Sequence, residues 1–88
     1  MTAQVVFFRQ PKSKPANWLT ITANLYSEGL NPDRQELTQS LKEFFAQVDS
    51  NEFIAGDDWE FQYFYCCMPQ ELAILFVLAN PKYAGRFR

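Results

Sequence analysis

Residues 31–49 read NPDRQELTQSLKEFFAQVD, and this stretch predicts one amphipathic helix. Asn31 suits the N-cap, Pro32 suits the first helical position, and Asp33 follows close to the positive end of the helix dipole. Five apolar side chains recur at i, i+4, i+7, i+8 and i+11 and form a single stripe, whose burial against other elements organises the fold. They are Leu37, Leu41, Phe44, Phe45 and Val48.

Two strands are predicted before the helix. Residues 4–10 are rich in Val and Phe and end at a turn bracketed by Pro11 and Pro15. Residues 18–26 alternate apolar and polar side chains, a period of two that is typical of a half-buried strand. We expect these two strands to form a hairpin.

Two further strands are predicted after the helix. Residues 59–66 alternate in the same way and follow a turn at 56–58. Residues 72–79, LAILFVLA, are continuously apolar and suit a central strand that ends before Asn80 and the proline after it. A short second helix that begins after Pro69 is the alternative.

These elements predict an α+β domain in ββαββ order, a small antiparallel sheet with one amphipathic helix packed on one face. A single domain spans residues 1–88, because a chain of this length is too short for a second core, and residues 82–88 form an irregular tail. The other face of the sheet then gathers Trp18, Tyr26 and Phe64, an aromatic surface of the kind that binds partners. A helix in place of the last strand would cover this face and remove that inference.

Charge is sorted along the sequence. Residues 28–60 hold nine of the ten acidic residues and two basic ones, although the net charge of the whole chain is only −2. The segments before and after them are basic, with net charges of +3 and +2. A locally acidic surface attracts basic partners even when the net charge is small, so the middle segment is the candidate binding region.

Neither catalytic nor metal-binding chemistry is predicted. The chain has no histidine, which removes histidine-based nucleophile systems, histidine metal sites and the usual general base near neutral pH. Cys66 and Cys67 are adjacent, so they form neither a spaced metal-ligand pair nor an unstrained disulfide. Residues 49–60 resemble a calcium loop in part but lack its central glycine, and no phosphate-binding glycine motif is present. We therefore expect a protein that is not an enzyme and has no cofactor.

The chain is also expected to be soluble and cytoplasmic. Its first residues do not have the pattern of a signal peptide. Its longest apolar run, residues 72–79, falls far short of the roughly 20 residues that cross a membrane as a helix. Both cysteines are then expected to stay reduced.

The acidic segment leads to the functional prediction, a non-catalytic module that binds another protein. We expect one acidic surface, formed by carboxylates on one face of the helix, in the loop after it and at the start of the next strand. This surface would dock on a basic groove of another protein, including a groove that binds nucleic acid. An inhibitor or adaptor of the kind found among phage and mobile-element anti-defence proteins would act in this way. Trp18 and Tyr26 are expected to serve as apolar anchors. The carboxylates of the predicted site are Glu36, Glu43, Asp49, Glu52, Asp57, Asp58 and Glu60.

The same sequence is compatible with two other functions. Sheet aromatics together with the basic termini would suit single-stranded nucleic acid, although the acidic pI of about 4.9 opposes phosphate binding. An uncovered aromatic sheet face would also suit a structural homodimer. The three functions differ in the surface that they use.

Overall fold

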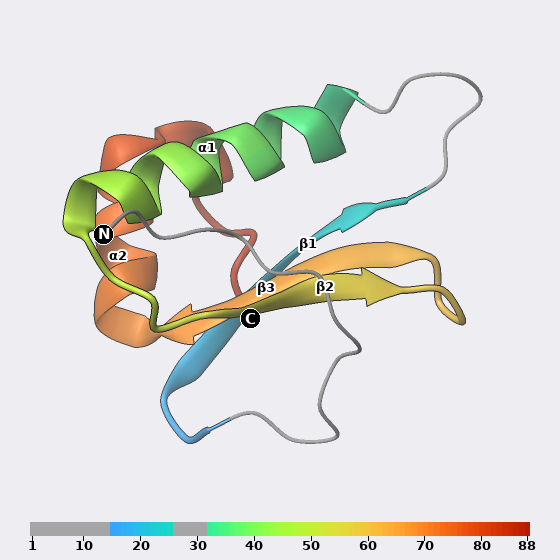
Figure 1. Ribbon diagram of the computed structural model, residues 1–88, viewed down its shortest axis with the longest axis horizontal. Coiled ribbons are helices and arrows are strands. Elements are labelled where there is room, and N and C mark those ends of the chain that lie inside the picture. The colour runs from blue at the N-terminus through green and yellow to red at the C-terminus, as the bar shows by residue number, and fades with distance from the viewer. Residues whose placement is uncertain (1–14, 26–31) are drawn as a thin grey trace.

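The structure, a computed structural model, describes residues 15–25 and 32–88. Within these ranges the chain forms three strands and two helices in β-α-β-β-α order (Figure 1). A 3-10 turn, Pro81–Tyr83, follows the second helix. The elements are β1 (Trp18–Asn24), α1 (Pro32–Val48), β2 (Ile54–Asp58), β3 (Tyr63–Pro69) and α2 (Gln70–Ala79).

The sheet is antiparallel, and β3 lies at its centre between β1 and β2. The register pairs Thr20 with Cys67 across β1 and β3, and Gly56 with Tyr65 across β2 and β3. The predicted α+β class with an antiparallel sheet is therefore confirmed. The predicted ββαββ order is wrong, and the strand predicted at residues 4–10 lies outside the described part of the chain.

The helix α1 forms where its sequence predicts it. Leu37, Leu41, Phe44 and Phe45 are buried, and Val48 is half-buried against the same core. The stripe faces the sheet because its spacing follows the helical period. The predicted N-cap lies outside the described residues.

The strand predicted at residues 72–79 is wrong, because these residues belong to α2, which begins directly after Pro69. A continuous apolar run is compatible with a buried strand and with a buried helix, so its pattern alone does not separate them. In the structure β3 already occupies the centre of the sheet. The run therefore packs over the core as a helix, with Ala73 and Phe76 buried three residues apart on one side. This is the alternative that Pro69 indicates.

The strand β3 begins later than predicted, at Tyr63, and its two faces are exchanged relative to the prediction. Phe64, predicted on the uncovered face, lies in the core together with Ile21. Alternation shows which residues share a face but not which face meets the core. The opposite face carries Tyr65 and Cys67, which have no solvent-exposed surface, so the centre of that face is closed rather than open.

Both helices lie on the same side of the sheet (Figure 1). The helix α1 runs roughly along the direction of β2 and β3 in this view, and α2 lies at the end where β3 finishes. The rings of Phe44 and Phe76 join the two helices edge to face, with centroids 5.3 Å apart. Neither helix of the described chain has the length and apolar character needed to cross a membrane.

The C-terminal segment packs against this core. Tyr83 is fully buried and stacks on a phenylalanine of α2, and Phe87 packs beside it. Thr20 and Arg88 exchange two backbone hydrogen bonds of 2.8 and 2.9 Å. The strand β1 pairs with β3 along one edge, and the last residues of the chain lie along its other edge. There they form hydrogen bonds with backbone groups of β1 that β3 does not reach.

Candidate interaction surface

The hairpin tip, Asp58 to Gln62, joins β2 to β3. Asp58 Oδ1 accepts the backbone N–H groups of Glu60 and Phe61, each at 3.1 Å. Gln62 has a φ of 60°, and its carbonyl accepts the N–H of Leu25 at 3.0 Å, which ties the tip to the end of β1. An aspartate at the start of a turn commonly caps the following amides in this way. The local sequence thus specifies an ordered turn.

The hairpin tip presents two aromatic side chains to solvent. Trp59 is 65% exposed and Phe61 is 69% exposed. The exposed side chain of Glu60 lies between them in the sequence. Trp and Phe are enriched in the buried centres of protein–protein interfaces, and Trp is frequent among the residues that contribute most to binding. The tip therefore combines apolar anchors with negative charge.

The sequence pattern predicts that Trp59 and Phe61 lie within a strand. Their alternation with Tyr63 and Tyr65 is typical of one continuous strand over residues 59–66. The turn predicted at residues 56–58 is displaced, since these residues belong to β2 and the chain reverses immediately after them. The signal that indicates the true turn is Asp58, because aspartate favours the first position of a β-turn.

Asp57 serves mainly to link two elements. Its carboxylate pairs with Arg34 of α1 at 3.3 Å, and the two side chains are only 17% and 28% exposed. The guanidinium of Arg34 also lies over the Phe64 ring, 5.7 Å from the centroid. Asp57 points to the helix side of the sheet, away from its neighbour Asp58, because adjacent strand residues alternate between faces. It therefore adds little to the charge of the hairpin tip.

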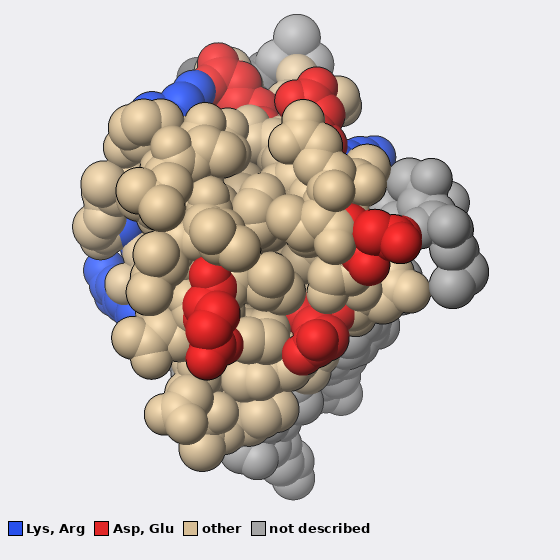
Figure 2. Space-filling view, turned by 90° about the vertical axis from the view of Figure 1, so that its left-hand side faces the viewer, with Lys and Arg blue, Asp and Glu red and all other residues tan. Residues whose placement is uncertain are grey.

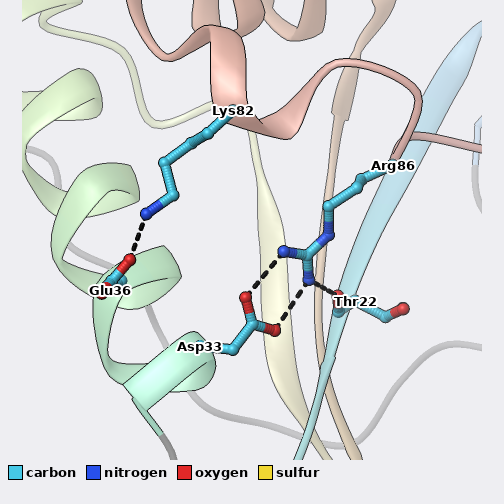
Figure 3. Close-up of polar contacts among 5 residues, drawn as sticks. All are labelled: Thr22, Asp33, Glu36, Lys82 and Arg86. Carbon is cyan, nitrogen blue, oxygen red and sulfur yellow. Dashed lines mark hydrogen bonds and ion pairs between the residues drawn. The ribbon is translucent and has the colours of Figure 1, made fainter.

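The first turns of α1 are also engaged with basic residues (Figure 3). Glu36 pairs with Lys82, and Asp33 accepts hydrogen bonds of 2.8 and 3.0 Å from Arg86. Arg86 donates a further hydrogen bond of 2.7 Å to the Thr22 carbonyl of β1. The hydrogen bond from Arg86 holds the pKa of Asp33 below its usual range, and the one to Glu36 raises the pKa of Lys82. The C-terminal cations thus neutralise one side of α1.

The remaining predicted carboxylates do not belong to the hairpin tip. Glu43 is exposed on α1 and accepts a hydrogen bond of 2.9 Å from Gln39. Asp49 follows α1 with a φ of 50°, and Glu52 lies in the loop before β2. Because Glu52 precedes β2 and Asp58 ends it, these two carboxylates belong to opposite ends of the strand.

Figure 2 views the molecule from the end where α2 lies and shows Asp and Glu side chains separated by uncharged surface. Lys and Arg side chains are visible only near the margins of this view. Among the described carboxylates of the predicted site, the structure brings Asp58 and Glu60 together at the hairpin tip and distributes the others over α1, the following loop and β2.

The two predicted apolar anchors do not join the hairpin tip. Trp18 begins β1, is half-buried and pairs across the sheet with Pro69. This pairing places it at the end of the sheet where β3 finishes, whereas the hairpin tip lies where β3 begins. Tyr26 lies outside the described residues. Trp59 and Phe61 supply the exposed apolar surface instead.

The nucleophilic side chains of the sheet are enclosed. Cys66 and Cys67 are fully buried and reduced, and Thr20 Oγ1 lies 3.2 Å from Cys67 Sγ. Burial raises the pKa of the Cys66 thiol, and it raises the pKa of Tyr65 to about 12, so both groups are protonated near neutral pH. Within residues 15–25 and 32–88, no cluster of three or more metal-ligating side chains is formed.

In comparisons with known proteins, no family model, no curated protein and no solved structure matches this chain at a significant level. Its function is therefore inferred from its own surface. The feature that bears on function is the hairpin tip, where exposed aromatic rings stand beside carboxylates on an ordered turn.

Proposed function

We propose that this protein is a non-catalytic interaction module that docks its hairpin tip on a basic surface of a partner protein. The observation that supports the proposal is the exposure of Trp59 and Phe61 on either side of Glu60, at a turn whose backbone is held by Asp58. Neither ring belongs to the hydrophobic core that residues 15–25 and 32–88 form. Their exposure is consistent with binding.

The two rings supply the apolar part of the binding energy. An aromatic side chain contributes about 150–250 Å² when it is fully buried, and its removal from water is worth on the order of 1.5–3 kcal/mol. The hydrogen bonds of Asp58 order the turn before the partner arrives, which reduces the entropy lost on binding. A fitting partner has an apolar pocket that accepts at least one of the rings.

The carboxylates of Asp58 and Glu60 determine the charge that the partner needs. They attract basic side chains beside the pocket and repel phosphate groups, so a basic protein fits the hairpin tip better than a nucleic acid does. Salt screens the attraction over about 8 Å at physiological ionic strength, so the basic residues must lie close to the bound tip. In the narrower form of the proposal, the basic surface is one that binds nucleic acid, and this protein acts as its inhibitor or adaptor.

Affinity capture from a lysate of the native host tests the proposal with four immobilised proteins. They are the wild type, Trp59→Ala, Glu60→Lys and a control, Leu78→Asp, which changes an exposed apolar residue in α2. We expect the wild type and the control to retain a basic protein that both hairpin-tip variants lose. Retention of the same proteins by all four baits would contradict the proposal.

The purified partner then permits a quantitative test. Calorimetric titration should show that Glu60→Lys weakens binding by about tenfold at low salt and by less at high salt, because screening removes part of the charge effect. Addition of single-stranded DNA should release the partner if its basic surface binds nucleic acid. A partner that keeps the hairpin tip bound in excess DNA removes the inhibitor form of the proposal and leaves the interaction module.

A further inference from the structure

Two arginines of this chain each combine a carboxylate with an aromatic ring. The first is Arg34, which donates to both oxygens of Asp57, at 3.3 and 3.4 Å, and lies over the Phe64 ring, 5.7 Å from the centroid. Asp57 and Phe64 are direct partners across β2 and β3, so one guanidinium reaches both. The planar guanidinium suits this pair of groups, because its donors lie in the plane and its face is free to cover a ring.

Arg86 has the same two kinds of contact at the start of α1. Its terminal nitrogens donate to the two oxygens of Asp33, at 2.8 and 3.0 Å, and its guanidinium lies 5.2 Å from the centroid of the Tyr83 ring. Lys82 also lies near the Tyr83 ring, but its single nitrogen pairs with one oxygen of Glu36. A guanidinium is more weakly hydrated than an ammonium, so it loses less water on contact with a ring. Arginine therefore fits a carboxylate beside an aromatic ring better than lysine does.

The hairpin tip presents a carboxylate and a ring of this kind without a cation. Asp58 Oδ1 lies 3.1 Å from the backbone nitrogen of Phe61, so the carboxylate is next to the residue that carries the ring. Phe61 is 69% exposed. Within residues 15–25 and 32–88, Asp58 Oδ2 accepts no hydrogen bond, and no lysine or arginine pairs with Asp58 or Glu60 or lies over the Phe61 ring.

We propose, on the basis of the proposed docking function, that the hairpin tip binds an arginine side chain of its partner. The guanidinium of this arginine lies over the Phe61 ring and donates to Asp58 Oδ2. The exposed side chain of Glu60, next to Phe61 in the sequence, adds a second negative charge that attracts it. Trp59 keeps its role as the ring that enters an apolar pocket of the partner.

The turn fixes the carboxylate before the arginine arrives. Asp58 Oδ1 accepts the backbone N–H groups of Glu60 and Phe61, which leaves Oδ2 for the partner and reduces the entropy lost on binding. A hydrogen bond from a guanidinium to a carboxylate is roughly twice as strong as one between neutral groups. The contact of the cation with the exposed ring adds a smaller preference. The tip should therefore distinguish arginine from lysine as well as attract positive charge.

NMR titration of the isotope-labelled protein with hexa-arginine and, separately, with hexa-lysine tests this recognition. The two peptides carry the same number of positive side chains, so charge alone would bind them about equally. We expect hexa-arginine to shift the amide signals of Glu60 and Phe61 and to bind there about two- to fivefold more tightly than hexa-lysine at low salt. Equal affinity of the two peptides at these signals overturns the arginine proposal, whereas affinity capture with Trp59→Ala and Glu60→Lys decides the docking function itself.

Three variants locate the contact. Phe61→Leu keeps an apolar side chain without a ring and should bring the ratio of the two affinities close to one. Asp58→Asn keeps an oxygen that accepts the two turn amides but removes the charge and the second acceptor, so hexa-arginine should bind about threefold or more weakly. Trp59→Leu is the matched control, because it makes the same change at a similarly exposed ring and should keep the preference. Loss of the preference in Trp59→Leu but not in Phe61→Leu overturns the placement of the arginine over Phe61.

Discussion

At the scale of single residues, Arg86 joins three elements of the domain. Its guanidinium donates to Asp33 at the start of α1 and to the Thr22 carbonyl of β1, and it lies 5.2 Å from the centroid of the Tyr83 ring. The planar group has several donors in fixed directions, so one side chain satisfies a carboxylate and a carbonyl at once. The contribution of this contact to stability depends on the ionised form of Asp33.

We expect Asp33 to make the stability of the domain depend on pH. Its folded pKa lies below the value of 3.8 of an unperturbed aspartate, because Arg86 hydrogen-bonds to the carboxylate. The stabilisation is therefore fully present above the unfolded pKa and is lost as pH falls through the lower folded pKa. The side chains are partly exposed, so the pair contributes roughly 0.2–1 kcal/mol.

Urea unfolding of the wild type and Asp33→Asn at a series of pH values measures this contribution. The wild type should have the larger free energy of unfolding near neutral pH, and the two proteins should converge in acid. In an Arg86→Ala background, Asp33→Asn should have a smaller effect, because the carboxylate then interacts mainly with the dipole of α1. A difference of undiminished size in that background would contradict the assignment of the pKa shift to Arg86.

At the scale of elements, the sequence predicts those whose signals lie within their own residues. The stripe of α1 and the alternation of β1 are local patterns, so α1 forms where it is predicted and β1 begins at Trp18 as predicted, although it ends at Asn24 instead of residue 26. The run at 72–79 is different, because its structure depends on which strand occupies the centre of the sheet. The sequence pattern does not predict the hairpin tip, because the alternation of apolar and polar residues continues through Trp59 and Phe61 as in a strand. The turn forms there because the side chain of Asp58 accepts two backbone N–H groups.

We expect Asp58→Ala to loosen the hairpin tip. The substitution removes the acceptor of two backbone N–H groups, which lowers the free energy of unfolding by about 1 kcal/mol. Hydrogen exchange measured by NMR should show faster exchange at the amides of Glu60 and Phe61. Glu60→Ala is the control, since it removes a neighbouring carboxylate and leaves the Asp58 acceptor in place. Unchanged exchange at both amides in Asp58→Ala would contradict this role.

At the scale of the whole molecule, ion pairs join segments that the charge pattern separates. Arg86 is 53 residues from Asp33, and Lys82 is 46 residues from Glu36. The basic C-terminal segment folds back on the acidic middle of the chain and neutralises part of it. The sequence therefore indicates where acidic residues are concentrated, but the carboxylates left at the surface depend on long-range pairs that no local pattern shows. Exposure of Trp59 and Phe61 likewise follows from the folded turn and not from composition.

The C-terminal segment is expected to stabilise the entire domain. Deletion of residues 86–88 removes the Arg86 bridge, the Phe87 ring from the core and the backbone pair with Thr20. Together these losses should lower the free energy of unfolding by about 3 kcal/mol, a large part of the roughly 5–15 kcal/mol of a typical domain. Denaturant unfolding should show the lower midpoint.

Two single variants divide this effect. Phe87→Ala should account for a substantial share of the loss, because the ring packs against the core and lies 6.0 Å from the Phe76 ring between centroids. Lys82→Ala should cost much less, since its ion pair with Glu36 is exposed and screened by water. A deletion variant as stable as the wild type would contradict this account, because the sheet and helices would then hold together without the segment that closes the edge of β1.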